Sequence, residues 1–482
     1  MTKLNGFGGI TTSVVSEVRD KFGTPCYLYD ETLLVEKCRQ AMSMPNAYGL
    51  RVRYAMKANS NRTLLKIIAD QGLYIDASSL NEARRAELAG IEPGRIMLTT
   101  QEVPEGADRR VLEDMMLRGM RYNVCSLLQL RLIADFASAN SLALSIRVHP
   151  GVGSGESASR NTGDDYSCFG IHLTDIAEAL RLASEKGLSF TRVHVHIGSG
   201  GDPELWRQNI DLELGFIEKY FPDAGAVNFG GGLKEARMPH EKAADIEALG
   251  LYAKQQIEAF YHRTGRKLHM EIEPGTFIAA NMGYIVTTVR DMKKTGESGL
   301  CFAVVDGGMD LNARPLLYGA QHPFYVISKD SRLLSSEFDM PDIGVRGMMV
   351  VGTCCESGDS LCLDSHANSA PRRMAEPAPI RAATEKFFRA AGDVVVYPRQ
   401  TLYYHAMLFP VVALVAFAAG YLIGRGDASY ELFIAGESAG KEEVLVEGRL
   451  VYDPGTGKLE GDGESIAILL PRDKRPKKKF SV

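Results

Sequence analysis

The chain has 482 residues, of which 45% are hydrophobic and 24% are charged. This length indicates two or three domains, and the composition is typical of a folded globular protein. A net charge of -5 argues against a general nucleic-acid binder, and the first residues lack the apolar segment of a secretory signal. The eight cysteines form no CxxC pair and no metal-ligand spacing. We therefore expect reduced thiols, no metal site and a cytoplasmic location.

Short apolar runs alternate with stretches of helical spacing through the middle of the chain. Several of these helical stretches end at a glycine, as at Gly72 and Gly90. The eight runs that read as strands are LRVRYAMKA, LYIDAS, RIMLTT, YNVCS, LALSIRVHP, TRVHVHIGS, AVNFGGG and KLHMEIEPG. Eight such units predict an α/β fold, a parallel (β/α)8 barrel over residues 38–282, rather than an open doubly wound sheet.

The pattern changes after about Met282, where strand-like runs are joined by turns with few helices. We expect residues 283–482 to form a separate β-sandwich or barrel-like domain, with the N-terminal segment 1–37 packing against it. A polar, proline-containing insertion near residues 361–390 is predicted to form a loop and one helix.

A stretch without formal charge runs from Gln400 to Gly424. Its apolar part approaches the roughly 20 residues that cross a bilayer. We favour a buried strand pair or a subunit-interface segment, broken at Pro410 and Gly420. The flanks lack the charge asymmetry that usually accompanies a membrane span.

Chemistry in a (β/α)8 barrel lies at the C-terminal ends of the strands, and four polar motifs fall there. Lys57 ends the first strand, and we expect it to be partly buried, because burial lowers the pKa of an amine. The other three motifs are HVHIGSG, NFGGG and EIEPG. Each also has a plain structural interpretation: a surface lysine, a core histidine, a glycine turn and a structural carboxylate.

Taken together, these motifs supply an amine, a flat ring, hydroxyl and backbone donors for a phosphate, and a carboxylate. Pyridoxal 5′-phosphate (PLP) requires such a set. An enzyme acting on a phosphorylated sugar would use the glycines as an anion cradle but would leave Lys57 and Glu273 unexplained.

The chain resembles the fold-type III, or group IV, PLP-dependent decarboxylases, and within them the diaminopimelate decarboxylases. The matching stretches run in the family's order from about residue 20 to 450. They are YAMKAN, DASSLNE, RVHPGV, CFGI, HVHIGSG, NFGGG, EIEPG, VVDGGMDLNARPLLYGAQH and CCESGD.

The resemblance implies roles for individual residues around the cofactor. Lys57 would bind the cofactor covalently, His196 would stack on its ring, and Glu273 would pair with the pyridine nitrogen. Asp76 and Glu82 would support the lysine and the ring. The phosphate would be held by Ser199, Gly230, Gly231, Gly232, Gly275 and Tyr421.

The resemblance also implies a homodimer with a shared active site for a small amino-acid substrate. Arg314 and Tyr318 would grip the substrate, with Arg314 for a carboxylate and Glu356 for an amine. Cys355, Glu356 and Asp359 match a stretch that would come from the partner subunit, and Cys355 and Lys57 would return a proton to Cα. The implied reaction is decarboxylation of meso-2,6-diaminopimelate to L-lysine and carbon dioxide, in lysine biosynthesis.

Two positions depart from the family's pattern. Thr276 follows Glu-Pro-Gly where the family has an arginine, and Cys168 stands where a lysine is usual. A threonine does not form a bidentate clamp on a carboxylate, so the substrate pocket is altered. The alternatives are a related substrate (lysine-, ornithine- or arginine-like, or from secondary metabolism), a non-catalytic regulatory homologue, a membrane-tethered enzyme and a racemase. The presence of Lys57 and Cys355 argues against the regulator.

Overall fold

The computed structural model describes residues 10–153, 162–163, 166–198, 201–364 and 368–377. It also describes the backbone of four short strands, β17 (Val394–Pro398), β18 (Glu431–Phe433), β19 (Arg449–Tyr452) and β20 (Glu460–Gly461). The chain divides into two compact units, Met1–Leu402 and Tyr403–Val482. Within the second unit, β18, β19 and β20 form a small antiparallel sheet.

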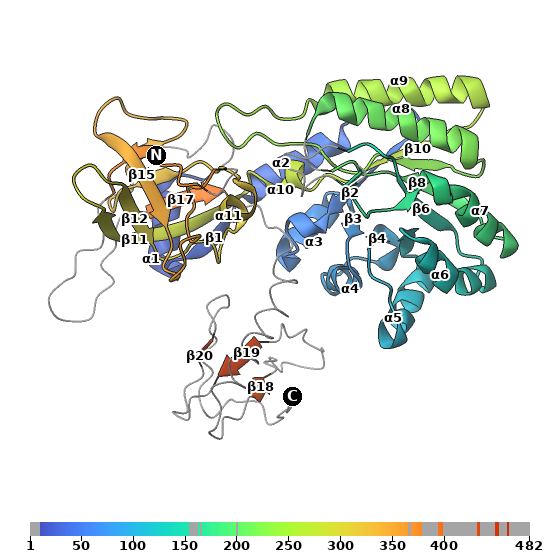
Figure 1. Ribbon diagram of the computed structural model, residues 1–482, viewed down its shortest axis with the longest axis horizontal. Helices are drawn as coiled ribbons and strands as arrows, with labels where there is room; N and C mark the ends of the chain where they lie inside the picture. Colours follow the sequence, from blue (N-terminus) through green and yellow to red (C-terminus); the bar gives the residue numbers. More distant parts are fainter. Residues whose placement is uncertain are drawn as a thin grey trace. The chain divides into compact units, whose positions relative to one another are not determined.

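The first unit contains a closed barrel of eight parallel strands, which confirms the predicted (β/α)8 fold (Figure 1). Pairing of β5 with β6 and of β10 with β2 closes the ring. The barrel strands are β2 (Leu50–Ala55), β3 (Tyr74–Ala77), β4 (Ile96–Thr99), β5 (Arg121–Val124), β6 (Leu144–His149), β8 (Phe190–His194), β9 (Ala226–Asn228) and β10 (His269–Ile272). A two-residue strand, β7 (Ile171–His172), adds to the edge of β6.

Helices surround the barrel, and α8 and α9 lie side by side (Figure 1). Short polar side chains start several of them: Asn61 accepts from two backbone N–H groups of α3, and Ser126 accepts from the N–H of Gln129 in α6. The helices are α2 (Glu31–Met42), α3 (Arg62–Asp70), α4 (Leu80–Leu88), α5 (Gly106–Leu117), α6 (Leu127–Ala139), α7 (Ile176–Glu185), α8 (Pro203–Tyr220), α9 (Ile246–Thr264) and the short α10 (Thr276–Ala279).

One ionic cluster is buried inside the barrel. Glu271 on β10 is fully buried and accepts hydrogen bonds from three arginines at 2.8 to 3.3 Å, Arg51 and Arg53 on β2 and Arg192 on β8. Burial alone would raise the pKa of Glu271, but the charges of Arg53 and Arg192 outweigh it and lower that pKa to about 2. The carboxylate is therefore ionised, and it ties three strands together.

A half-barrel of antiparallel and parallel strands forms the rest of the first unit. The N-terminal strand β1 (Cys26–Tyr29) pairs with β11 (Gly283–Lys294), as expected for a β domain that includes the N-terminal segment. The other strands are β12 (Cys301–Val305), β13 (Tyr325–Ile327), β14 (Leu333–Ser336), β15 (Val345–Val351), β16 (Arg372–Ala375) and β17. The helices here are α1 (Thr12–Phe22) and α11 (Arg314–Tyr318).

The prediction for the polar insertion was wrong in its described part. Residues 372–375 form strand β16, which pairs with β15 in antiparallel register, rather than a loop. Two side chains of this strand, Arg372 and Met374, are buried, so the strand packs into the domain. The predicted helix and the uncharged stretch from Gln400 to Gly424 lie outside the described residues. Among the residues that are described, none forms a helix long and apolar enough to span a membrane.

Candidate active site

Lys57 lies on a one-turn 3-10 helix, Met56–Ala58, directly after β2. Its neighbours Met56 and Asn59 are buried, whereas the Lys57 side chain is exposed. The prediction of a partly buried lysine was therefore wrong for the single chain. Burial along this segment ends at Met56, so the Lys57 side chain lies exposed at the end of the barrel.

Glu273 follows β10, and polar groups hold both of its carboxylate oxygens. Asn228 Nδ2 donates to Oε1 at 2.6 Å, and His194 Nε2 lies 3.2 Å from Oε2. Burial would raise the pKa of Glu273, but the His194 ring and the Asn228 amide outweigh burial and hold this pKa far below its ordinary range. Glu273 is thus an ionised carboxylate although only 6% of its surface is exposed.

The tautomer of His194 follows from its other neighbour. Asn123 accepts a hydrogen bond from Ser145 Oγ through Oδ1 at 2.9 Å, so its Nδ2 donates to His194 Nδ1 at 2.7 Å. A neutral His194 ring therefore carries its proton on Nε2, the nitrogen nearest Glu273. His194 and Asn123 were not assigned from the sequence. The alternation along β8, which places His194 on the same face as His196, is the signal that would have found His194, whereas Asn123 lies on β5 and no such signal points to it.

His196 faces the glycine turn that follows β9. Its Nδ1 accepts the N–H of Gly231 at 3.1 Å, so a neutral ring has its proton on Nε2. The pKa of His196 lies well below its ordinary value, mainly because the ring is buried and also because the positive charges of Lys57 and Arg147 disfavour its protonation. The ring is therefore neutral at physiological pH. Arg147, a buried cation on β6, is a further residue near the site that the sequence analysis did not assign.

The glycine turn is tightly fitted to its surroundings. Gly230 has φ of 68°, and a Cβ on it would lie 2.6 Å from the carbonyl oxygen of Val195. The N–H of Gly230 donates to Asn228 Oδ1 at 3.0 Å, and that of Gly231 donates to His196. Two of the three N–H groups expected to cradle a phosphate are therefore already engaged, and for the third, that of Gly232, no acceptor is found among the described residues. Trp206 Nε1 donates to the Gly231 carbonyl at 3.2 Å and pins the turn to α8.

Asp76 and Glu82 lie at the end of β3 and in the first turn of α4. Asp76 is buried, and this burial is the main reason that its pKa lies well above the ordinary value. The negative charge of Glu273 raises the pKa of Asp76 further, whereas the positive charge of Lys57 lowers it. Glu82 accepts the N–H of Ser78 at 2.8 Å while Ser79 Oγ accepts the N–H of Glu82 at 3.1 Å. This reciprocal capping gives Glu82 a structural role at the start of α4. Ser199 and Tyr421 lie outside the described residues.

The residues expected to contact the substrate come from two places. Arg314 is buried at the start of α11, with its guanidinium carbon 5.6 Å from the Tyr318 ring centre. Thr276 is the half-buried first residue of α10. It follows Gly275, where a Cβ would lie 3.3 Å from both Ala55 Cβ and Ala58 Cβ, so α10 begins beside the Lys57 turn.

Cys355 and Glu356 are exposed on a turn that follows β15. Buried Asp359 anchors this turn by accepting the N–H groups of Met309 at 2.7 Å and Cys354 at 2.8 Å. Within the part of the chain that the structure describes, neither exposed side chain contacts Lys57 or Glu273. The structure therefore brings together the residues at the strand ends and leaves the Cys355 turn apart from them.

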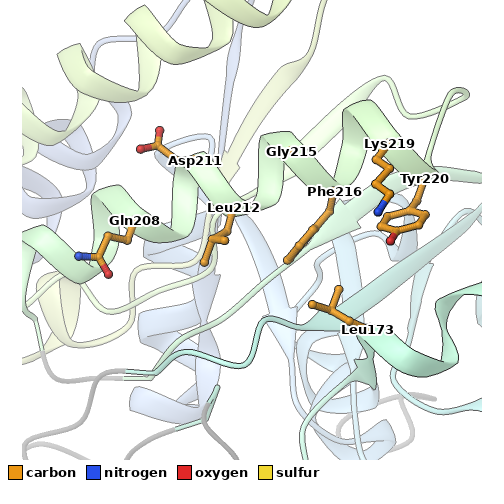
Figure 2. A pocket seen from close by; sticks show the side chains of 8 residues that line it. All are labelled: Leu173, Gln208, Asp211, Leu212, Gly215, Phe216, Lys219 and Tyr220. Atoms are coloured by element: carbon orange, nitrogen blue, oxygen red, sulfur yellow. The ribbon is translucent and has the colours of Figure 1, made fainter.

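A hollow of about 670 Å³ lies along the outer face of α8 and is open to solvent. Figure 2 shows its lining, which comes from α8 together with Leu173. None of the candidate site residues lines this hollow, so it is distinct from the strand-end site.

The strand-end residues fit PLP in their chemistry. An amine, a neutral flat ring, an ionised carboxylate and a glycine turn meet at neighbouring strand ends, from Lys57, His196, Glu273 and Gly230–Gly232. A carboxylate that stays ionised in a buried place suits the pyridine nitrogen, because it favours the protonated ring.

Comparison with known proteins identifies the class. Residues 33–280 match the family model described as the pyridoxal-binding domain of pyridoxal-dependent decarboxylases. The chain belongs to this family, whose members are PLP-dependent carboxy-lyases that act on amino acids of the diaminopimelate, ornithine and arginine group. The prediction of a PLP-dependent decarboxylase is thereby confirmed.

Individual relatives carry a narrower description. The chain is 32% identical to a diaminopimelate decarboxylase of Methanothermobacter thermautotrophicus over 360 residues, covering 72% of this chain and 79% of that protein. It is 31% identical to the diaminopimelate decarboxylase of Escherichia coli (strain K12) over 363 residues, covering 74% and 81%. A crystal structure of a diaminopimelate decarboxylase superposes with a TM-score of 0.70 at 27% identity, covering 83% of this chain and 88% of that one.

Proposed function

We propose that this enzyme is a diaminopimelate decarboxylase that converts meso-2,6-diaminopimelate to L-lysine and carbon dioxide. The observation that carries the proposal is the buried carboxylate of Glu273, kept ionised by His194 and Asn228 beside the neutral ring of His196. The relatives named diaminopimelate decarboxylase, which align over most of the chain, support the choice of substrate.

Each strand-end residue has a distinct task in this proposal. Bound PLP supplies an electron sink that stabilises the electron pair left when carbon dioxide departs. Glu273 would hold a proton on the pyridine nitrogen, because its ionised carboxylate attracts the protonated ring. His196 offers a flat face to the ring and adds no charge, because its pKa is depressed. Lys57 would supply the amine that binds the cofactor. The phosphate would lie at the glycine turn Gly230–Gly232, where the N–H of Gly232 is the available donor because those of Gly230 and Gly231 are engaged, with Ser199 and Gly275 beside it.

We further propose that the enzyme acts as a homodimer in which Cys355 and Glu356 reach the partner's site. Both side chains are exposed in the single chain, and Asp359 holds their turn in a defined shape. Cys355 would then return a proton to Cα with Lys57, Glu356 would bind the distal amine, and Arg314 with Tyr318 would bind a carboxylate.

A second candidate substrate group has one observation in its favour. Thr276 stands at the start of α10, beside the Lys57 turn, and offers no charge there. A site without a carboxylate clamp suits lysine, ornithine or arginine, or a related amino acid of a secondary pathway, better than a dicarboxylic substrate.

The test is an absorbance spectrum with PLP followed by measurement of carbon dioxide release from meso-diaminopimelate, lysine, ornithine and arginine. We expect an absorbance band near 420 nm (roughly, for a PLP–lysine adduct) in the wild type. Lys57→Ala should lose this band and all carbon dioxide release. Lys66→Ala, at an exposed lysine on α3, is the matched control and should keep both.

Release from meso-diaminopimelate alone supports the proposed substrate. Release only from lysine, ornithine or arginine moves the assignment to the second group. A cofactor band that persists in Lys57→Ala would refute the role of Lys57.

A further inference from the structure

A chain of polar contacts crosses the interior of the barrel and ends at Glu273. Its side chains are Ser145 on β6, Asn123 on β5, His194 on β8 and Glu273 after β10. Their exposed fractions are 2%, 0%, 1% and 6%, so the contacts between them are shielded from solvent. The protonation of His194 is therefore decided by its neighbours in this chain.

A backbone group sets the direction of the donors around Glu273. The N–H of Gly230, which can only donate, lies 3.0 Å from Asn228 Oδ1. Asn228 therefore turns its Nδ2 to Glu273 and donates to Oε1 at 2.6 Å. Because Glu273 is ionised, its Oε2 can only accept, and His194 Nε2, at 3.2 Å from Oε2, must carry a proton.

The other nitrogen of the His194 ring decides whether the ring is charged. Nδ1 lies 2.7 Å from Asn123 Nδ2, which can only donate, so Nδ1 accepts and carries no proton. Ser145 Oγ donates to Asn123 Oδ1 at 2.9 Å and supports this orientation of the amide. The 3.2 Å between His194 and Glu273 agrees with a neutral donor, because a charged ring and a carboxylate approach to about 2.7–2.9 Å.

A neutral His194 leaves the charge of Glu273 without a cation from the protein. Glu271, two residues earlier on the same strand, accepts from three arginines. Over the described ranges of the chain, by contrast, no lysine or arginine forms an ion pair with Glu273. A buried charge is costly unless it is paired, so this place favours a cationic partner. The protonated pyridine ring is the cation that PLP offers.

We propose that Asn123 is a positioning residue that, through His194, preserves one uncompensated negative charge at Glu273 and so selects the cofactor form with a protonated ring nitrogen. Asn123 acts at a distance, since its amide contacts His194, Ser145 and Thr99. An acceptor in place of the amide nitrogen would require a proton on His194 Nδ1, and the resulting cation would take up the charge of Glu273. This inference rests on the proposed decarboxylase function.

The first test compares kcat of Asn123→Asp and Asn123→Ala in the full-length enzyme loaded with PLP. Asn123→Asp keeps the shape of the side chain but forces a proton onto Nδ1. It should lower kcat by about ten-fold or more with KM little changed, because about one unit of pKa at the ring nitrogen is a ten-fold change in protonation. Asn123→Ala leaves His194 neutral and should stay within about three-fold of the wild type. Asn140→Asp, at an exposed site, is the control.

The order of the two variants separates positioning from packing. A residue that serves only packing loses more in Asn123→Ala, which opens a cavity and removes the hydrogen bonds of the amide. We expect the opposite order. The other titratable groups that face Glu273 are unchanged in both variants; they are Asp76 on β3, Glu213 on α8 and His196.

Nitrogen-15 NMR of histidine-labelled protein, with and without PLP, reads the charge of His194 directly. Its signals are those that disappear in His194→Gln. We expect one protonated and one unprotonated ring nitrogen in the wild type and in Asn123→Ala, and two protonated nitrogens in Asn123→Asp. With labelled PLP bound, the pyridine nitrogen should be protonated in the wild type and should lose its proton at lower pH in Asn123→Asp.

Two protonated nitrogens on His194 in the wild type would overturn the proposal, even if a variant fails to fold. A larger loss of kcat in Asn123→Ala than in Asn123→Asp would also overturn it. In both cases the cofactor band and carbon dioxide release would leave the decarboxylase function standing. Absence of the cofactor band in the wild type would refute the proposed function, and the selection of a cofactor form with it.

Discussion

His194 Nε2 lies 3.2 Å from Glu273 Oε2, and this proximity fixes the state of the carboxylate at the centre of the site. The amide of Asn123 sets the tautomer that turns the Nε2 proton toward Glu273. Asn228 donates to the other oxygen. Glu273 is therefore ionised by its neighbours in the protein, before any cofactor nitrogen is considered.

Asn228→Asp should move the acidic limb of the pH–rate profile to higher pH. The substitution would place a second carboxylate where the amide nitrogen now lies 2.6 Å from Glu273, and two carboxylates at this distance share a proton. Glu273 would then ionise only at higher pH, so kcat at neutral pH should fall by about ten-fold or more. Asn140→Asp, at the exposed C-cap of α6, is the control. An unmoved acidic limb would show that Asn228 does not tune Glu273.

Gly230→Ala should destabilise the protein more than Gly187→Ala does. Both glycines have nearly the same positive φ, 68° and 66°, so both variants carry a strain of about 1–2 kcal/mol. A Cβ at Gly187 meets nothing within 4 Å, whereas one at Gly230 lies 2.6 Å from the Val195 carbonyl oxygen. The clash should lower the free energy of unfolding by about 1–3 kcal/mol more, measured by urea denaturation. Equal losses in the two variants would contradict the tight fit of the turn.

Glu271→Gln should lower the free energy of unfolding by about 3–5 kcal/mol, because it leaves Arg51, Arg53 and Arg192 without their shared carboxylate. Glu178→Gln, in an exposed ion pair with Arg181, should change stability little. Denaturant midpoints of the two variants check this. A small loss for Glu271→Gln would mean that the buried arginines find other acceptors.

The lowered pKa of Glu271 predicts that the free energy of unfolding depends on pH. The pKa of Glu271 falls from 4.5 to about 2 on folding, so its contribution is complete above pH 4.5. It is lost as the pH falls from 4.5 through about 2, where the folded carboxylate takes up a proton. The difference in unfolding free energy between wild type and Glu271→Gln should therefore shrink over this range.

Mixing two inactive variants should restore activity if the site is shared between subunits. Lys57→Ala lacks the amine and Cys355→Ala lacks the thiol, but a mixed dimer has one site with both. Random exchange of subunits then gives about a quarter of the wild-type activity. Mixing Lys57→Ala with itself controls for contamination. No gain on mixing would place Cys355 in its own chain's site or outside the site.

The barrel was predictable because its strands are continuous apolar runs that stop at turns, as in RIMLTT, which contains β4. The alternating polar residues at the strand ends also indicated Lys57, His196 and Glu273. The short strands β14 and β16 were not predicted, since their four residues carry more polar side chains than a regular strand and depend on pairing with distant partners.

The supporting residues of the site were missed for a different reason. Asn123, His194 and Asn228 come from three strands, and only closure of the barrel brings them around one carboxylate. Apart from the alternation along β8 that pairs His194 with His196, their spacing in the sequence carries no sign of this meeting. The exposure of Lys57 was also not predictable, since it depends on where packing by neighbouring elements ends.

Trp206 is the single tryptophan of the chain, and its indole N–H bonds to the carbonyl of Gly231. All indole emission of the protein therefore originates at one buried ring, which touches the turn proposed to receive the phosphate. The enzyme thus carries a native optical reporter, and loading or emptying of this turn should be followed by fluorescence without any engineered label.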